Sequence, residues 1–180
     1  VFASKAKKQI FDSPLKEWIA DWGSDSKISI TTKASGLVDG FGYTLDTKTG
    51  GMNRIIGDKK GLTTLLSPDG KKLLYSTFDG GAIQTYVMDI TTGKTNPISP
   101  SALPEKCVWA NDSKEVFCFA SVRAMTGTLP DDWYKGVVSF DDALWVTDLV
   151  NFNGNIIQDF NSKSSQRLDA INPIMNSSQD

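Results

Sequence analysis

A block of sequence that recurs three times is the strongest constraint on how this chain folds. Each copy contains a tryptophan or leucine, then a tight turn centred on an aspartate, then a hydrophobic run. The turn aspartates are Asp25, Asp69 and Asp112, which lie 44 and then 43 residues apart. A period of about 40 to 45 residues is typical of four-stranded propeller blades. The sequence therefore predicts an all-β chain in which each repeat forms one blade.

Each repeat carries the signals for four antiparallel strands. The first two strands flank the aspartate turn, where Asp and Asn side chains bond the backbone ahead and Gly70 accepts a positive φ. The third strand has an aromatic residue three positions before a second aspartate, and a polar outer strand follows a glycine. These aromatic and aspartate pairs are Tyr43 with Asp46, Tyr86 with Asp89, and Trp145 with Asp148. One such unit cannot bury both of its faces, so neighbouring blades are expected to stack.

The repeats divide the chain, residues 1–180, into three complete blades and two partial ones within a single β-propeller segment. The blades are predicted at 15–57, 58–99 and 100–160, with an insertion at 121–139, an outer strand of a preceding blade at 1–14, and the start of a next blade at 161–180. Three blades fall short of the roughly four to eight that close a ring. We therefore expect further blades outside this chain, or copies of it, to complete the ring. A β-sandwich is the alternative, but the regular order of hairpins favours the propeller.

Composition and charge exclude several classes of function. The formal charge of −2 and the pI of about 5.2 provide no basic surface for nucleic acid. No apolar stretch approaches the roughly 18 residues of a membrane-spanning helix. The chain has no histidine, which removes histidine-dependent triads and the commonest zinc ligand. Phosphate-binding loops, nucleophile elbows and Cys-x-x-Cys sites are also missing. We therefore predict no catalytic residue, no metal and no cofactor.

The second repeat resembles a known propeller family. Its segment Leu-Ser-Pro-Asp-Gly-Lys-Lys-Leu-Leu-Tyr at 66–75, followed by Met-Asp-Ile-Thr-Thr-Gly at 88–93, resembles the repeat of TolB-like, WD-related β-propellers. The first and third repeats depart from it, with Gly-Ser-Asp-Ser and Ala-Asn-Asp-Ser in place of Ser-Pro-Asp-Gly. Residues 104–136 also resemble uncharacterised exported propeller proteins of small-genome bacteria. TolB-like repeats occur in periplasmic scaffold proteins and in gating propellers of prolyl-oligopeptidase-type hydrolases. The resemblance thus implies binding or gating rather than chemistry within the blades.

Two cysteines flank the hairpin of the third repeat. With the turn near Asp112 and Ser113, Cys107 and Cys118 fall opposite each other on adjacent strands. Opposed residues have Cα separations of about 4.5 to 5.5 Å, which overlaps the range of a disulfide. A pair of reduced, buried cysteines is the alternative. A disulfide would indicate an oxidising compartment.

The insertion in the third repeat holds the candidate binding residues. Its central part contains Asp131, Asp132, Trp133, Tyr134 and Lys135, in a connection that propellers place on the face used by many ligands and partners. Aromatic rings offer a large contact area with a polar tip. Two interpretations remain open: these rings contact a partner, or they pack the loop down on its own blade.

Two acidic pairs, Asp131 with Asp132 and Asp141 with Asp142, raise the question of calcium binding or glycoside chemistry. Neither pair has the spacing of an EF-hand, and adjacent residues on a strand point to opposite faces. We expect these side chains to be solvated or to cap turns.

The predicted function is that of a non-catalytic scaffold or binding module from an exported bacterial protein, periplasmic or otherwise associated with the cell envelope. Its top-face loops, including 131–135, are expected to bind a protein, peptide or glycan. The alternative is the gating propeller of a larger prolyl-oligopeptidase-type hydrolase. A propeller enzyme with a site in its central channel is disfavoured by the missing histidine.

Overall fold

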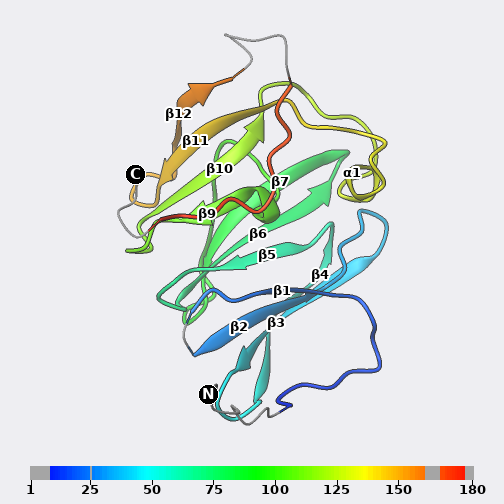
Figure 1. Ribbon diagram of the computed structural model, residues 1–180, viewed down its shortest axis with the longest axis vertical. Coiled ribbons are helices and arrows are strands. Elements are labelled where there is room, and N and C mark those ends of the chain that lie inside the picture. The colour runs from blue at the N-terminus through cyan, green and yellow to red at the C-terminus, as the bar shows by residue number, and fades with distance from the viewer. Residues whose placement is uncertain (1–8, 25, 161–166, 177–180) are drawn as a thin grey trace, which may run out of the picture.

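The computed structural model describes residues 9–24, 26–160 and 167–176, and it shows three four-stranded antiparallel sheets in chain order. The first blade contains β1 (Trp18–Asp21), β2 (Lys27–Thr32), β3 (Asp39–Asp46) and β4 (Met52–Lys60). The second contains β5 (Thr63–Leu66), β6 (Lys72–Asp79), β7 (Ala82–Asp89) and β8 (Thr95–Pro97). The third contains β9 (Cys107–Trp109), β10 (Glu115–Ser121), β11 (Asp142–Asp148) and β12 (Gly154–Asp159). The blades stack one above the next (Figure 1), which confirms the predicted partial β-propeller.

Helix is confined to two single turns in the described part of the chain. They are the 3-10 helix η1 (Pro104–Lys106), which precedes β9, and the short helix α1 (Asp131–Tyr134) in the insertion. Among the described residues, no helix is long and apolar enough to cross a lipid bilayer.

The turn aspartates form turns, as their positions predict. The Asp69 carboxylate accepts a hydrogen bond from the Lys71 backbone N–H at 3.0 Å. In the second turn of each repeat, Asp46 accepts from the Thr49 N–H at 2.7 Å and Asp89 accepts from the Thr92 N–H at 2.8 Å. These bonds lower the pKa of Asp46 and of Asp89. Asp25 lies outside the described residues.

Neighbouring blades bury each other's faces. The core between the first and second blades contains Ile56, Leu62, Leu66, Leu73, Tyr75 and Met88. The core between the second and third blades contains Leu74, Val87, Ile98, Ala102, Trp109, Val116 and Ala120, together with both cysteines. Alternate residues of β6 serve the two cores, because successive side chains of a strand point to opposite faces. The middle blade is therefore covered on both sides.

The two ends of the described chain contain no strand. In the part of the predicted outer strand that is described, Ile10 and Phe11 instead pack against the first blade beside Ile28, Ile30 and Leu45. Residues 167–176, predicted as the start of another blade, lie along the third blade without forming a strand. A strand forms only where a neighbouring strand pairs with it, and neither segment pairs with a strand of the described chain. The boundary expected after residue 57 falls within β4, which continues to Lys60.

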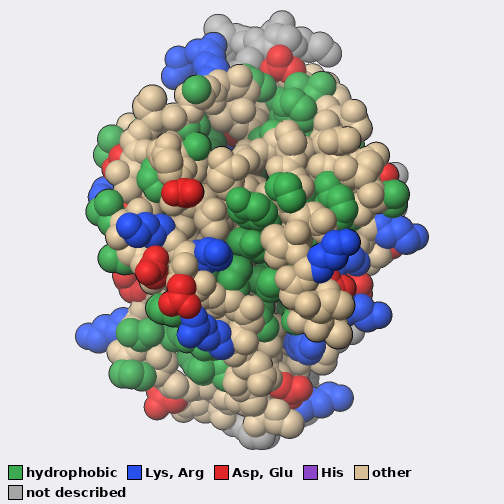
Figure 2. Space-filling view, turned by 180° about the vertical axis from the view of Figure 1, so that it is seen from behind, with side chains coloured by type: hydrophobic (Ala, Val, Ile, Leu, Met, Phe, Trp, Pro, Cys, Tyr) green, Lys and Arg blue, Asp and Glu red, His purple; other side chains and the backbone are tan. Residues whose placement is uncertain are grey.

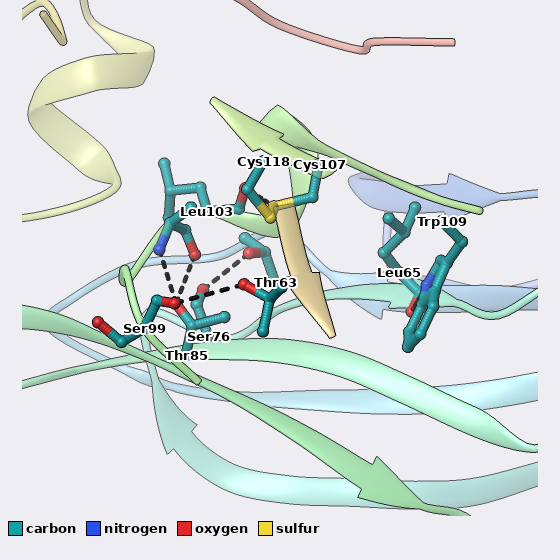
Figure 3. The surroundings of a disulfide bond; sticks show 11 residues. Thr63, Leu65, Ser76, Thr85, Ser99, Leu103, Cys107, Trp109 and Cys118 are labelled. Carbon is teal, nitrogen blue, oxygen red and sulfur yellow. Dashed lines mark hydrogen bonds between the residues drawn. A yellow bond between two sulfur atoms is a disulfide. The ribbon is translucent and has the colours of Figure 1, made fainter. Parts of the chain in front are cut away.

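The disulfide expected in the third blade is present. Cys107 on β9 and Cys118 on β10 are direct register partners, with a Cα separation of 4.1 Å. Their side chains are almost fully buried, at 3% and 2% exposure. Figure 3 shows the disulfide close to the buried hydroxyl groups of Thr63, Ser76 and Thr85. The bond therefore closes the inner hairpin of the third blade within the core.

Candidate functional site

The insertion between β10 and β11 lies on one end of the sheets, which we call the top face. The loops of the top face join β2 to β3, β6 to β7 and β10 to β11, and also connect successive blades. Figure 1 shows the insertion, with α1, at the same edge of the stack as the loop between β2 and β3. Backbone hydrogen bonds from Asp132 N–H to the Thr128 carbonyl and from Tyr134 N–H to the Pro130 carbonyl, both 2.9 Å, form its single helical turn.

The insertion crosses from the third blade to the first two blades. The Asp131 carboxylate accepts a hydrogen bond of 2.7 Å from the Gly36 backbone N–H, in the loop between β2 and β3. Although partial burial raises the pKa of Asp131, this hydrogen bond contributes to a net lowering. The Leu129 carbonyl also approaches Gly61, which connects the first blade to the second and has a φ of +64°. The insertion thus contacts all three blades, rather than packing only on its own blade.

This close approach requires a glycine at position 36, and replacing Gly36 tests the contact between the insertion and the first blade. A Cβ atom at Gly36 would lie 2.5 Å from the Leu129 carbonyl oxygen, which belongs to backbone and cannot rotate away. We expect Gly36→Ala to lower the free energy of unfolding by about 1 to 3 kcal/mol, as overpacking does. Chemical denaturation measures this loss. Gly51→Ala is the matched control, because its Cβ would meet only the Thr49 hydroxyl, at 3.2 Å. Equal stability of the two variants would contradict the close packing of the insertion against the first blade.

Trp133 is partly buried at the top face, where its ring makes packing contacts and its indole nitrogen makes a hydrogen bond. Its Nε1–H donates to the Asp169 carboxylate, at 3.1 Å to Oδ2. Its ring meets Phe140 edge-on, with centroids 5.7 Å apart, and lies 5.2 Å from the Lys106 ammonium. Trp133 therefore connects α1 to the segment that follows the third blade.

Tyr134 borders an open groove on the top face. Its hydroxyl donates to the Glu105 carboxylate at 2.8 Å, and burial raises the pKa of both groups. The groove has a volume of about 370 Å³, and its walls come from the start of the first blade and from the insertion side of the third. Its lining residues are Lys16, Glu17, Trp18, Ile19, Lys33, Glu105 and Tyr134. Tyr134 thus lines the groove while Glu105 fixes the position of its hydroxyl group.

The remaining two candidates of the insertion differ in exposure. Asp132 is partly buried and accepts a hydrogen bond from the Thr128 N–H at 2.8 Å, so it stabilises the turn that leads into α1. Lys135 is exposed beyond the end of α1. The structure therefore gathers all five predicted residues on the top face, but with different environments.

A fully buried lysine beneath the insertion was missed by the sequence analysis. The Lys106 ammonium contacts the carboxylates of Asp142 at 2.7 Å and Asp169 at 2.5 Å, and it donates to the Ala170 carbonyl at 2.6 Å. It also lies 4.6 Å from the centre of the Phe140 ring. Burial raises the pKa of Asp142 despite the ammonium beside it. No local signal marks Lys106, because its partners follow it by 36 and 63 residues in the sequence.

The acidic pair at 141 and 142 is buried, contrary to the expected solvated or turn-capping role. Asp141 pairs with Arg123, whereas Asp142 pairs with Lys106. The two side chains therefore have different partners, as adjacent positions at the start of a strand allow. Each carboxylate is buried because a cation from another segment compensates its charge.

The described residues bring together no cluster of potential metal ligands, and one face of the molecule carries charges of both signs. No group of three or more potential metal-ligating side chains lies together in the described ranges. On the face shown in Figure 2, lysine and arginine side chains are interspersed with aspartate and glutamate. That pattern does not provide the single-sign surface that a phosphate backbone requires.

Comparisons with known proteins agree on the architecture. No protein-family profile matches the sequence, and neither does any functionally curated protein. Among solved structures, TolB from Acinetobacter baumannii is similar over 83% of this chain and 34% of its own, with 18% identity and a TM-score of 0.56. The β-propeller domain of the Trilobed protease from Pyrococcus furiosus is similar over 81% of this chain and 43% of its own, with 16% identity and a TM-score of 0.51. The chain thus spans less than half the length of either structure and has a TolB-like β-propeller fold.

Proposed function

We propose that this segment, with its TolB-like propeller fold, is a non-catalytic binding module of an exported or envelope-associated bacterial protein. Its partner is a protein, peptide or glycan, held on the top face by the region 131–135. The observation that carries the proposal is the open groove beside Tyr134, which lies where the insertion meets the first blade. The buried disulfide supports export, because such bonds rarely persist in a reducing cytosol.

The groove offers both apolar and charged contacts. Trp18 and Tyr134 contribute aromatic surface, and aromatic residues dominate the energetics of many interfaces. An exposed ion pair between Lys33 and Glu17, 2.9 Å apart, lies on the wall contributed by the first blade. In the proposal, Tyr134 and Lys135 contact the partner, while Asp131, Asp132 and Trp133 hold the loop in place. A preorganised loop loses little conformational entropy when a partner binds.

Crosslinking in the native cell tests the proposal. A photoreactive residue at Lys135 is expected to give a discrete adduct with the partner, because Lys135 is exposed and directly follows Tyr134, which lines the groove. Lys94 is the matched control, since it is also an exposed lysine but lies in the turn between β7 and β8, on the opposite end of the blades. The Lys135 adduct should weaken when Tyr134 is replaced by alanine. The same adducts from both positions would contradict a top-face site.

The second candidate function is gating in a larger hydrolase. It is supported by the similarity to the propeller domain of the Trilobed protease. In that case the reading frame around this segment would encode a Gly-x-Ser-x-Gly nucleophile elbow and a histidine. A purified parent protein would then hydrolyse peptides, and deletion of the insertion would change the size of peptide it accepts. A parent protein with neither feature would rule this function out.

A further inference from the structure

Two of the three arginines in the chain line one cavity at the base of the insertion. Arg123 follows β10, whereas Arg167 lies in the segment after β12. The cavity has a volume of about 380 Å³, and its other polar lining comes from Ser121, Thr126, Ser139 and Asp141. It is separate from the groove at Tyr134, with which it shares no lining residue.

Arg123 is held in place by a buried carboxylate. Its Nε lies 2.9 Å from Oδ2 of Asp141, whose side chain is only 6% exposed. The Asp141 backbone is fixed as well, because its carbonyl accepts from the Val122 N–H at 2.9 Å. A buried carboxylate is stable only when its charge is compensated. Neither carboxylate oxygen of Asp141 accepts a hydrogen bond among the described residues, so the carboxylate holds the Nε side of the guanidinium by charge alone.

The terminal nitrogens of Arg123 remain available to a ligand. The Arg123 side chain is 64% exposed, and the contact with Asp141 is its only ion pair in the described part of the chain. Guanidinium presents several N–H donors in a rigid fork that matches a carboxylate in two parallel hydrogen bonds. Arg167 supplies a second guanidinium from another segment, with no ion pair to any described residue.

The charge of the cavity selects among possible anions. Two guanidinium groups against one carboxylate leave a single net positive charge among the lining residues. That balance matches a monovalent carboxylate better than a phosphate group, which carries about −1.5 to −2 at neutral pH. The Ser121 hydroxyl oxygen already accepts from the backbone N–H groups of Arg123 and Asp141. The Ser139 hydroxyl donates to the Asp169 carboxylate at 3.0 Å, so its oxygen can still accept a hydrogen bond from an N–H of the ligand.

We propose that this cavity binds the C-terminal carboxylate of a peptide. Arg123 holds the carboxylate in two hydrogen bonds, Arg167 contributes the second positive charge, and Asp141 is a positioning residue that does not touch the ligand. The site is independent of the function proposed for the groove at Tyr134.

Side-chain NMR with a pair of small probes tests the site. Acetyl-trialanine with a free carboxylate is expected to shift the Nε–H signals of Arg123 and Arg167, and to bind at least ten times more tightly than the same peptide with a C-terminal amide. Arg123→Gln and Arg167→Gln should each weaken binding about tenfold. Arg54→Gln is the control, because Arg54 is also a partly exposed arginine paired with an aspartate, Asp58, but does not line this cavity. Equal binding of acid and amide, or tighter binding of inorganic phosphate, would overturn the proposal.

Asp141→Asn separates positioning from simple charge attraction. If the cavity attracted anions only through its net charge, removal of a negative charge would tighten binding of the free-acid peptide. If Asp141 orients Arg123, the same change weakens binding several-fold although the cavity becomes more positive. A circular dichroism spectrum like that of the unaltered protein shows that the variant is folded. Tighter binding by Asp141→Asn would contradict the assigned role.

Discussion

Replacing Lys106 with methionine is expected to lower the free energy of unfolding by about 3 to 5 kcal/mol, the range found when one partner of a buried ion pair is removed. The Lys106 and Asp142 side chains are both fully buried, and the ammonium is also a partner of Asp169. Methionine fills a similar volume but leaves these carboxylates without their cation. Chemical denaturation at neutral pH measures the loss.

The pH dependence of this loss identifies its cause. Burial already raises the pKa of Asp142, and removal of the ammonium raises it further. A carboxyl group whose pKa is higher in the folded state opposes folding increasingly as pH rises above its unfolded pKa. The deficit of Lys106→Met should therefore be larger at pH 7 than at pH 5.

Two further variants distinguish a lost ion pair from a general effect of losing a lysine. Lys72→Met is the control, because Lys72 is partly exposed and lies 3.5 Å from the Asp69 carboxylate. Lys72→Met should lower the free energy of unfolding by less than about 1 kcal/mol, because surface ion pairs contribute no more than that. Lys106→Met combined with Asp142→Leu should be more stable than Lys106→Met alone, since no unpaired carboxylate then remains at position 142. A loss within about 1 kcal/mol for Lys106→Met would show that the buried network does not stabilise the top face.

The sequence was sufficient for the blades because their signals are local and repeated. Turn residues such as Asp69 and Gly70, and aromatic residues such as Tyr86, act within a few positions of themselves. Counting from the turn also placed Cys107 opposite Cys118, because antiparallel register follows from the position of the turn. These features depend on residues that are close together in the sequence, so they can be predicted from it.

The top-face network is different because its members come from segments far apart in the sequence. Lysine is almost never fully buried unless it is paired, so Lys106 gave no reason to expect burial. Its partner Asp142 belongs to an acidic pair that resembled solvated residues, and Asp169 follows the last blade. The same holds for Asp131, whose hydrogen bond reaches Gly36 in another blade. Such contacts depend on how the blades stack, which a repeat pattern does not specify.

Replacing both cysteines of the disulfide with alanine is expected to lower the free energy of unfolding by about 3 kcal/mol. Cys107 and Cys118 are separated by 11 residues, and for a closed loop of this size the restriction of the unfolded chain corresponds to about that value. The first strand of the hairpin, β9, has only three residues, so few ladder bonds hold it without the crosslink. Denaturant titration of the double variant and of the oxidised protein measures the difference.

Reduction of the unaltered protein gives an independent measure of the same bond. Because both sulfur-bearing side chains are nearly inaccessible in the folded state, a reductant should reach them mainly through opening of the hairpin or through global unfolding. The rate of thiol release should therefore rise with denaturant, in parallel with unfolding. Rapid release in the native protein, together with an unchanged denaturation midpoint, would show that the crosslink contributes little to the third blade.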